Sequence, residues 1–568
     1  MPAAGPTPSG AKEFDAIVIG SGIGGLSTAA YLTANGMRTL VLEQYDTVGG
    51  CSHVFRRHSK FEFDVGLHYV GDCGPGGVVP TVLSGVGLGD KVSFLEMDPD
   101  GFDTLLFPDF EFRVPKGWDR YLERLIEACP GDEPGLRRAV EVMSAIPEEL
   151  EGRDEANGGS PWGPTTIEWG LRTLNDLFDA CELSAKARGI LAGESIDHAA
   201  PPSRAAIALH AGLMDHYIRG GAWYPEGGAQ VLAAHLIDVI HSHGGRVRTR
   251  ARVDRILVEG GRVAGVEIRG GERIAASVVV SNADIKRTYL ELLEPGVLPP
   301  EARERAEGYR MALPLFCVYL GLDIDLSERM PNTNYWCHAD LDSEPYHELC
   351  YRGELPEDLH PEEAFAYLTS ASVKDPHSGH SAPEGHSTLE LITLAPPQYS
   401  YWEIEQGPAA GEKYSKRGAY RDKKERLADT LIARAAQVID GLEDHIVFRE
   451  AATPITQERY TLSSGGACYG LEFSPDQVGP NRPRPETEIE GLYLAGASIM
   501  WAHGIMGSMR GGVATAGSIL GRDVFEEAKA GHVFADTDLL TAGGEGWDPL
   551  MASKRLSKKP RSRAAVAR

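Results

Sequence analysis

The sequence predicts an α/β protein in which a nucleotide-binding domain is interrupted by a second domain. Residues 14–43 follow the pattern of strand, helix and strand, with glycines spaced G-x-G-x-x-G before the helix. Two further apolar runs, at 275–283 and 489–496, are typical of buried strands in the middle and near the end of the chain. Alternating apolar and polar runs at 92–114 predict strands of a second domain.

The glycine motif at the first strand has the composition that a dinucleotide site needs. Gly20 permits a tight turn, Gly22 lets a pyrophosphate approach bare backbone, and Gly25 lets the helix pack closely on the strand. The helix start offers N–H groups and a partial positive charge to the phosphates. Glu43 ends the second strand, where a carboxylate would accept the ribose hydroxyls. A glycine-rich loop in another strand-turn-helix unit is the alternative.

A second glycine pair narrows the choice of dinucleotide. Residues 46–55, DTVGGCSHVF, place Gly49 and Gly50 just past the acidic residue. This resembles the extended fingerprint of flavoproteins, in which such a pair lies over the pyrophosphate of FAD, and a nicotinamide-only enzyme has no need of it. FAD is therefore the expected cofactor. Arg56 or Arg57 would neutralise phosphate charge there, or belong to a solvated turn.

Length, charge and cysteine content limit the class of protein. The 568 residues suggest two to four domains, and the net charge of -26 argues against a nucleic-acid partner. The eight cysteines are scattered, which favours a reducing, cytoplasmic location over a disulfide framework or a zinc site. No convincing membrane span is present. We expect a disordered leader at 1–13 and a disordered tail at 530–568, whose basic end gives peripheral contact with anionic lipid as the alternative.

The remaining chain alternates predicted helices and strands. Residues 61–71 predict a strand that leads into a loop near the cofactor, and 311–322 predict the central strand of the second domain. Residues 246–258 and 262–269 predict a strand pair joined by a glycine turn. Helices are expected at 78–89, 118–145, 166–217 with a break at 201–202, 229–243, the second half of 405–437, and from about 507.

Four sequence blocks carry a family resemblance. The chain resembles the phytoene desaturase and carotenoid isomerase group of FAD-dependent oxidoreductases, and within it the retinol saturase branch. The helix HAGLMDHYIRGG, which precedes the widely shared YPEGG segment, points to that branch. The blocks are GSGIGGLSTAAYL with GGCSHVF and FEFDVGLHYVG; PPSRAAIALHAGLMDHYIRGGAWYPEGG; VVVSNADIKRTYLELL; and GLYLAGASIMWAHGIMGSMRGG.

The resemblance implies a discontinuous, glutathione-reductase-like Rossmann-type FAD domain and an inserted α+β substrate domain. The FAD domain would comprise 14–90, 225–290 and 486–525, and the substrate domain 91–224 and 291–485. The implied cofactor-binding residues are Gly20, Ser21, Gly22, Gly24, Gly25, Glu43, Gln44, Gly49, Gly50, Arg56, Val253, Gly496, Ala497, Ser498, Ile505, Met506 and Gly507.

One departure from the family pattern concerns the flavin ring. The last strand of the family usually ends in Gly-Asp or Gly-x-Asp, whereas here Gly496 is followed by Ala497 and Ser498. Ser498 can still form hydrogen bonds but carries no charge. The following loop is also about one residue longer by comparison with the family, and it contains Trp501 and His503.

The resemblance implies chemistry on a C=C bond of an apolar polyene or isoprenoid lipid, by saturation, desaturation or isomerisation. His68, Tyr69, Tyr224 and His503 are candidates to line the substrate face and supply a proton, with a structural role as the alternative for each. The chain has one dinucleotide fingerprint, so the unidentified electron donor or acceptor is expected to be a transient partner or a small carrier.

Two other functions and one other site stay open. An amine-oxidase-like flavoenzyme would share the nucleotide domain but needs an aromatic cage near the flavin, whereas a polyene enzyme needs a long apolar tunnel. A non-catalytic, flavin-bearing lipid-binding protein is the third reading. Residues 375–386 hold three histidines, but their spacing fits no standard ligand pattern, so no metal site is expected.

Overall fold

The computed structural model describes residues 13–58, 60–152, 162–501 and 503–556. The expected leader, apart from residue 13, and the end of the basic tail lie outside the described residues. Within the described part of the chain, no helix is both long and apolar enough to cross a membrane.

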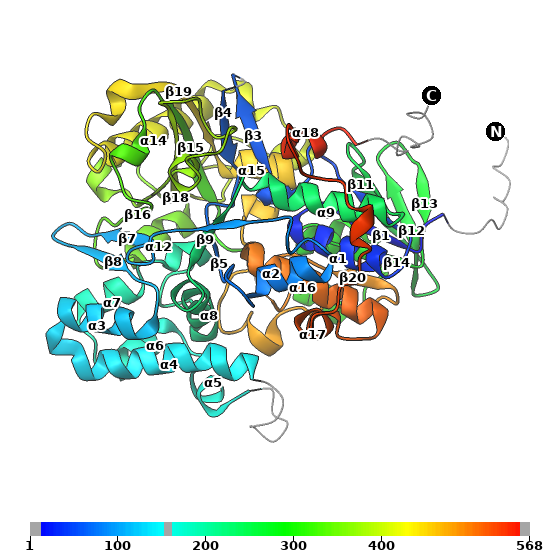
Figure 1. The fold of residues 1–568 in the computed structure, drawn as a ribbon, viewed down its shortest axis with the longest axis horizontal. Helices are drawn as coiled ribbons and strands as arrows, with labels where there is room; N and C mark the ends of the chain where they lie inside the picture. The colour runs from blue at the N-terminus through cyan, green and yellow to red at the C-terminus, as the bar shows by residue number, and fades with distance from the viewer. Residues whose placement is uncertain (1–12, 59, 153–161, 502, 557–568) are drawn as a thin grey trace.

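A five-stranded parallel sheet is built from the two ends and the middle of the chain, which confirms the α/β class (Figure 1). All five strands are short, and the three central ones are almost completely buried, as expected for a sheet covered on both faces. In spatial order they are β10 Arg246–Arg248, β2 Thr39–Leu42, β1 Ala16–Ile19, β14 Val278–Ser281 and β20 Leu492–Leu494.

Helix α1, Ile23–Ala34, packs between α9, Gln230–Ser242, and α16, Gly504–Leu520. Because α1 is covered on several sides, nearly all of its residues are buried, and it is apolar all round. The contact with α16 is especially close, since a Cβ atom on Gly512 would lie 2.2 Å from the carbonyl oxygen of Gly24. Small residues thus set the distance between the two helices whose starts face the cavity described below.

The second sheet has seven strands and is mixed. The segment expected to form its central strand instead lies second from an edge, because the strand from 446–452 is the outermost one. Helix α14, Gly418–Ala436, covers one face. In spatial order the strands are β19 Ile446–Ala452, β15 Leu315–Leu322, β18 Ser387–Leu394, β17 Ala366–Thr369, β16 Asn334–Cys337, β7 Asp103–Leu106 and β8 Glu111–Val114.

Three small sheets complete the strands, and one of them corrects an expectation. The run 246–258 is not a single strand: it is divided near Arg250, whose φ is 55°, and only its second part pairs with the segment after it. The small sheets are β5 Val70–Gly71, β9 Ala222–Pro225 and β6 Phe94–Glu96; β11 Val253–Glu259, β12 Arg262–Ile268 and β13 Arg273–Ala275; and β3 Val54–Arg57 with β4 Phe61–Asp64.

The other helices gather mainly beside the second sheet (Figure 1). The expected helix at 118–145 is divided at Cys129-Pro130, and α16 begins three residues earlier than expected. The helices are α2 Val78–Gly85, α3 Trp118–Ala128, α4 Glu133–Glu151, α5 Pro164–Trp169, α6 Leu174–Ala180, α7 Ala185–Leu191, α8 Ile207–Ile218, α10 Ile285–Arg287, α11 Pro300–Gly308, α12 Glu344–Arg352, α13 Ala371–Lys374, α15 Pro454–Thr461, α17 Val524–Lys529 and α18 Pro549–Ala552.

Residues 530–556 are folded against the nucleotide domain, so the expected disorder of this tail is wrong for the described part. Leu550 in α18 is 1% exposed and belongs to the core that contains α9. The N–H of Val48 donates to the carbonyl of Ser553, and Arg56 forms an ion pair with Asp548 at 2.5 Å. The polar composition of this segment predicts disorder, because the few residues that anchor it give no signal in the sequence.

Candidate functional site

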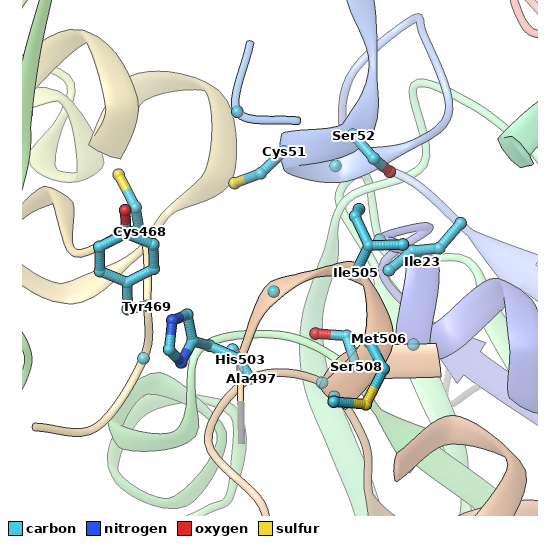
Figure 2. A pocket seen from close by; sticks show the side chains of 18 of the residues that line it. Ile23, Cys51, Ser52, Cys468, Tyr469, Ala497, His503, Ile505, Met506 and Ser508 are labelled. Carbon is cyan, nitrogen blue, oxygen red and sulfur yellow. The ribbon is translucent and has the colours of Figure 1, made fainter. Parts of the chain in front are cut away.

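A cavity of about 850 Å³ lies at the carboxyl ends of β1, β2, β14 and β20 and extends to the second sheet. Open parallel sheets place their ligands at this edge. Figure 2 shows part of the wall, where Ile23 and Ser52 lie on one side and Tyr469 and His503 on the other. The volume is in the range of cavities that hold cofactors and drug-sized ligands.

Two glycine loops touch at one end of the cavity. The N–H of Gly49 donates to the carbonyl of Ser21 at 3.1 Å, and a Cβ on Gly50 would lie 2.7 Å from the Cα of Gly22. Gly25 does not line the cavity; a Cβ there would lie 2.5 Å from the carbonyl oxygen of Gly20. Bare backbone therefore forms this end of the cavity, and Gly25 serves the contact of helix with strand.

Glu43 is fixed beside these loops. Its Oε2 atom accepts hydrogen bonds from the N–H of Ser21 at 2.9 Å and from the Ser21 hydroxyl at 2.6 Å, while Oε1 accepts from the N–H of Tyr45. Gln44 and Val253 line the same end of the cavity. The wall here combines a held carboxylate with main-chain groups, which suits a ribose and its base.

The start of α16 forms another part of the wall. Ile505, Met506 and Gly507 lie in its first turn, whose N–H groups have no partner within a helix and carry a partial positive charge. The preceding loop, with Gly496, Ala497 and Ser498, also lines the cavity. Helix α1 begins at the glycine end in the same way, so two helix starts face one cavity.

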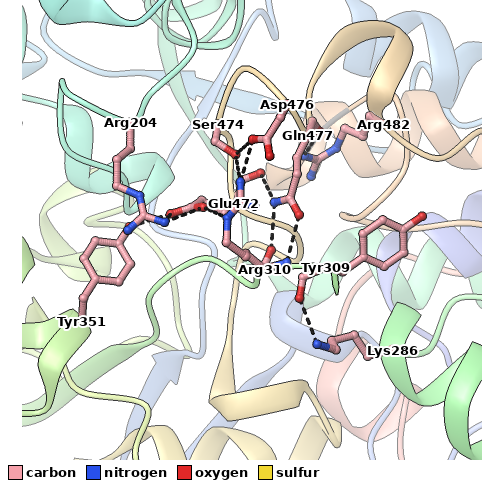
Figure 3. Close-up of polar contacts among 10 residues, drawn as sticks. All are labelled: Arg204, Lys286, Tyr309, Arg310, Tyr351, Glu472, Ser474, Asp476, Gln477 and Arg482. Atoms are coloured by element: carbon pink, nitrogen blue, oxygen red, sulfur yellow. Dashed lines mark hydrogen bonds and ion pairs between the residues drawn. The ribbon is translucent and has the colours of Figure 1, made fainter. Parts of the chain in front are cut away.

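A buried arginine holds that loop. Arg482 is 3% exposed, and its guanidinium donates to the carbonyls of Ala497 at 2.8 Å and Ile499 at 3.0 Å. Burial lowers the pKa of Arg482 to about 9. Nearby, Glu472 accepts from Arg310 and pairs with Arg204 (Figure 3). The contacts of Arg482 fix the position of the loop, although Ser498 itself carries no charge.

Besides Gly25, two predicted site residues lie away from the cavity. Arg56 is engaged by carboxylates, with Glu62 and Asp548 each at 2.5 Å, so it does not reach a phosphate at the glycine loops. Tyr224 is buried behind the wall, where its hydroxyl donates to Oδ2 of Asp64 at 2.6 Å. The prediction that these two side chains touch a ligand is therefore wrong.

His68, Tyr69 and His503 do line the cavity. The Nδ1 atom of His68 lies 2.9 Å from Oε2 of Glu390, a residue of β18 that is almost fully buried. Burial lowers the pKa of His68 to about 4 and raises the pKa of Glu390 to about 8. Burial also lowers the pKa of His503 to about 3, and one of its ring nitrogens, Nε2, lies 2.8 Å from the carbonyl oxygen of Asp197. Both imidazoles are therefore neutral at physiological pH.

Aromatic rings and buried carboxyl groups meet at the part of the cavity nearest the second sheet. Tyr69 stacks on Tyr217 with 4.3 Å between ring centroids, and its hydroxyl donates to Asp103 at 3.0 Å. Burial and the charge of Asp103 raise the pKa of Asp197 to about 7. Glu194 lies in the same group, and burial raises the pKa of its carboxyl well above the usual range.

Sequence reasoning missed several lining residues, of which Asn282 is the clearest. It directly follows β14, so the rule that ligands gather at the carboxyl ends of parallel strands could have found it. Its side chain fills the space that Cβ atoms on Gly22 and Gly496 would need. Asp197, Cys51 and Cys468 gave no local signal, because what brings them to the cavity is the packing of distant segments. The same holds for Glu390, which lies behind the wall and contacts His68.

The residues present fit a dinucleotide. Two helix starts, touching glycine loops and a held carboxylate supply the groups that phosphates and ribose require. Among the described residues, no group of three or more His, Cys, Asp or Glu could hold a metal ion, and this includes the histidine loop at 375–386. Fold and site together define a dinucleotide-binding α/β protein.

The family follows from residues 23–406, which match the flavin containing amine oxidoreductase family. The chain belongs to this family, and membership implies an FAD-dependent oxidoreductase. It is 28% identical to all-trans-retinol 13,14-reductase of Danio rerio, over 91% of this chain and 88% of the relative. It is 27% identical to prolycopene isomerase 2 of an Oncidium hybrid cultivar, over 89% and 83%. These relatives confirm the expected resemblance.

A solved structure of putrescine oxidase bound to putrescine has a TM-score of 0.60 with this chain, at 14% sequence identity. It covers 90% of this chain and 99% of its own. At that identity the likeness shows the fold alone.

Proposed function

We propose that the protein is an FAD-dependent oxidoreductase that saturates a C=C bond of an apolar polyene or isoprenoid lipid. One observation carries the proposal: a single cavity joins the glycine loops to an apolar region of the second domain. The apolar side chains of that region are Leu150, Ile196, Leu209, Leu213, Leu315 and Ile392. A long hydrocarbon would bury its surface there, which is favourable by about 25 cal/mol per Å².

The protein's own part in the reaction is to bind, orient and keep water out. Bound FAD supplies hydride chemistry, which is the step that side chains cannot perform. Gly22, Gly49 and the start of α1 would hold its phosphates, and Glu43 its ribose hydroxyls. The partial positive charge at the start of α16 would stabilise negative charge on the bound coenzyme. The apolar wall would hold the polyene in place and exclude water.

The relatives support a polyene over other substrates. A retinol reductase and a prolycopene isomerase both match along most of the chain, and both names specify a conjugated isoprenoid. Reduction needs an electron donor, and the single dinucleotide motif favours a small carrier or a transient partner. For the domains we propose the division given above, with the folded segment 530–556 added to the FAD domain.

The test uses the purified protein with its bound coenzyme. We expect a yellow protein whose flavin bleaches on anaerobic reduction and reoxidises when all-trans-retinol or prolycopene is added. Mass spectrometry of the product should show a gain of two hydrogens for saturation. A new isomer of unchanged mass would show that the enzyme isomerises the polyene and does not reduce it. If no polyene alters the spectrum of the reduced flavin, the proposal fails.

A second candidate, oxidation of an amine, is favoured by the aromatic residues of the cavity. The stacked Tyr69 and Tyr217 lie beside Asp197, whose carboxylate could pair with an ammonium group. The same protein would then reduce its flavin in the presence of a polyamine and release hydrogen peroxide in air. Polyamines and polyenes assayed in parallel separate the two candidates.

A further inference from the structure

His68 and Glu390 form a pair in which only the imidazole reaches the cavity. The side chain of His68 is 14% exposed and lines the wall, whereas that of Glu390 is 2% exposed and lies behind it. Oε1 of Glu390 accepts a hydrogen bond from the N–H of Asp64 at 2.9 Å. Oε2 faces Nδ1 of His68 at 2.9 Å, which leaves Nε2 as the imidazole nitrogen available to a ligand. Proton transfer operates at such separations.

The charged groups around His68 and Glu390 favour one protonated carboxyl group. Lys374, 3% exposed, is the cation that most affects Glu390, and its charge also acts on Asp64, while its ammonium donates to the hydroxyl of Thr369. Two buried carboxyl groups thus lie in the field of one ammonium group, and like charges in a dry site are costly, so one carboxyl retains its proton. The other titratable groups that face Glu390 are Tyr224 on β9 and Cys317 and Tyr319 on β15.

We propose that His68 delivers the proton of the reaction and that Glu390, a positioning residue acting through His68, stores it. The inference rests on the proposed saturation. The C=C bond gains a hydride, which brings both electrons, and a proton. That proton leaves Nε2 of His68 for carbon as the proton on Oε2 of Glu390 passes to Nδ1. His68 stays neutral throughout, and Glu390 ends as a carboxylate that the charge of Lys374 favours.

This route removes a difficulty that the burial of His68 creates. A single general acid would have to carry its proton as imidazolium, but burial lowers the pKa of His68 to about 4. Little of that cation exists at neutral pH. Transfer through both ring nitrogens needs no cation at any stage, and the charge change falls on Glu390, whose carboxylate form the charge of Lys374 favours. After product release, water entering the cavity restores the proton.

The first test does not depend on turnover. In the holoenzyme at pH 7, infrared spectroscopy should show the C=O band of a buried, protonated carboxyl group that Glu390→Gln removes and Glu443→Gln, at an exposed site, does not. Lys374→Met should shift the titration of this band to higher pH, since the ammonium favours the carboxylate. Nitrogen NMR should show His68, assigned with His68→Gln, as the Nε2–H tautomer. A Glu390 band absent at pH 7, or an Nδ1–H tautomer, would overturn the proposal.

The second test uses turnover and separates the two proposals. Gln keeps the shape of Glu390 and the contact with Asp64 but cannot give up a proton, so Glu390→Gln should lower kcat about 100-fold or more with little change in KM. The solvent deuterium isotope effect should grow in the variant. Wild-type kcat and isotope effect in Glu390→Gln would contradict the relay while leaving polyene reduction intact. A wild-type protein that reduces no polyene but keeps the carboxyl band would instead contradict the proposed function.

Discussion

The carboxylate of Glu43 accepts hydrogen bonds from both the main-chain N–H and the hydroxyl of Ser21. The two residues are 22 positions apart, at the carboxyl ends of adjacent parallel strands. The contact fixes the glycine turn to the end of β2, and it orients a buried charge toward the cavity before any ligand arrives. Such preorganisation lowers the entropic cost of binding.

The first prediction concerns that charge. Glu43→Gln keeps an acceptor oxygen but loses the negative charge that strengthens hydrogen bonds to ribose hydroxyls, so the Kd for FAD should rise about tenfold. Fluorescence titration of the apoprotein with FAD measures it. Glu259→Gln, at the exposed last residue of β11, is the matched control and should bind as tightly as wild type. Equal affinities for all three proteins would show that Glu43 does not contact the coenzyme.

The second prediction concerns Gly22 in the glycine loops, where a substitution should abolish coenzyme binding. In Gly22→Glu, the new Cβ would lie 2.7 Å from Nδ2 of Asn282, and the carboxylate would repel phosphate. We expect a colourless protein that retains its secondary structure by circular dichroism. Gly418→Ala, at the start of α14 where a Cβ meets nothing within 4 Å, should stay yellow. A yellow Gly22→Glu protein would disprove the placement of the phosphates.

Acid should destabilise the protein through a buried histidine pair. His210 lies 3.0 Å from both the carbonyl oxygen of Leu191 and Nε2 of His198, and burial lowers its pKa to about 4. Because the unfolded chain binds this proton near pH 6.5, stability is complete above that pH and falls as pH drops toward 4. The loss should be about 1 kcal/mol per pH unit between pH 6 and 4.5.

His210→Gln removes that titration. The free energy of unfolding of the variant minus that of wild type, measured by urea denaturation, should therefore increase by about 1 kcal/mol for each pH unit between pH 6 and 4.5 as the pH falls. His445→Gln, at a half-exposed site beside Asp323, serves as the control. A difference between His210→Gln and wild type that does not vary with pH would mean that His210 is not held neutral by the fold.

The folded C-terminal segment can be tested with two adjacent residues. Leu550 is 1% exposed and Met551 is 64% exposed, although both lie in α18. Leu550→Ala should cost about 2–4 kcal/mol in stability, whereas Met551→Ala should cost less than about 0.5 kcal/mol. Urea denaturation of the two variants measures the contrast. Similar small losses for both would show that this segment does not pack on the domain.

Local features of the fold could be predicted from the sequence because short segments determine them. The strand, glycine turn, helix and terminal Glu43 all lie within 30 residues, and each part has its own physical requirement. The sequence alone predicts a start of α16 three residues late, since Gly504 and Gly507 are equally good as helix boundaries.

Long-range pairings could not be predicted, and they decide the catalytic side of the site. Arg56 looked available for phosphate because nothing near it in the chain shows that Asp548 would bind it from 492 residues away. In the same way, nothing near Tyr224 in the chain shows that its hydroxyl would donate to Asp64. The sequence identifies His68 as a candidate but not Glu390, because the role of Glu390 depends on a neighbour from another segment.

The anchoring of Ser553 to Val48 and of Asp548 to Arg56 has a consequence for biogenesis. The loop next to these contacts carries Gly49 and Gly50. Its final geometry therefore depends on residues that are added to the chain some 500 positions later. We therefore expect FAD to bind firmly only after the C-terminal segment has been synthesised. Cells short of riboflavin should then accumulate complete chains without coenzyme.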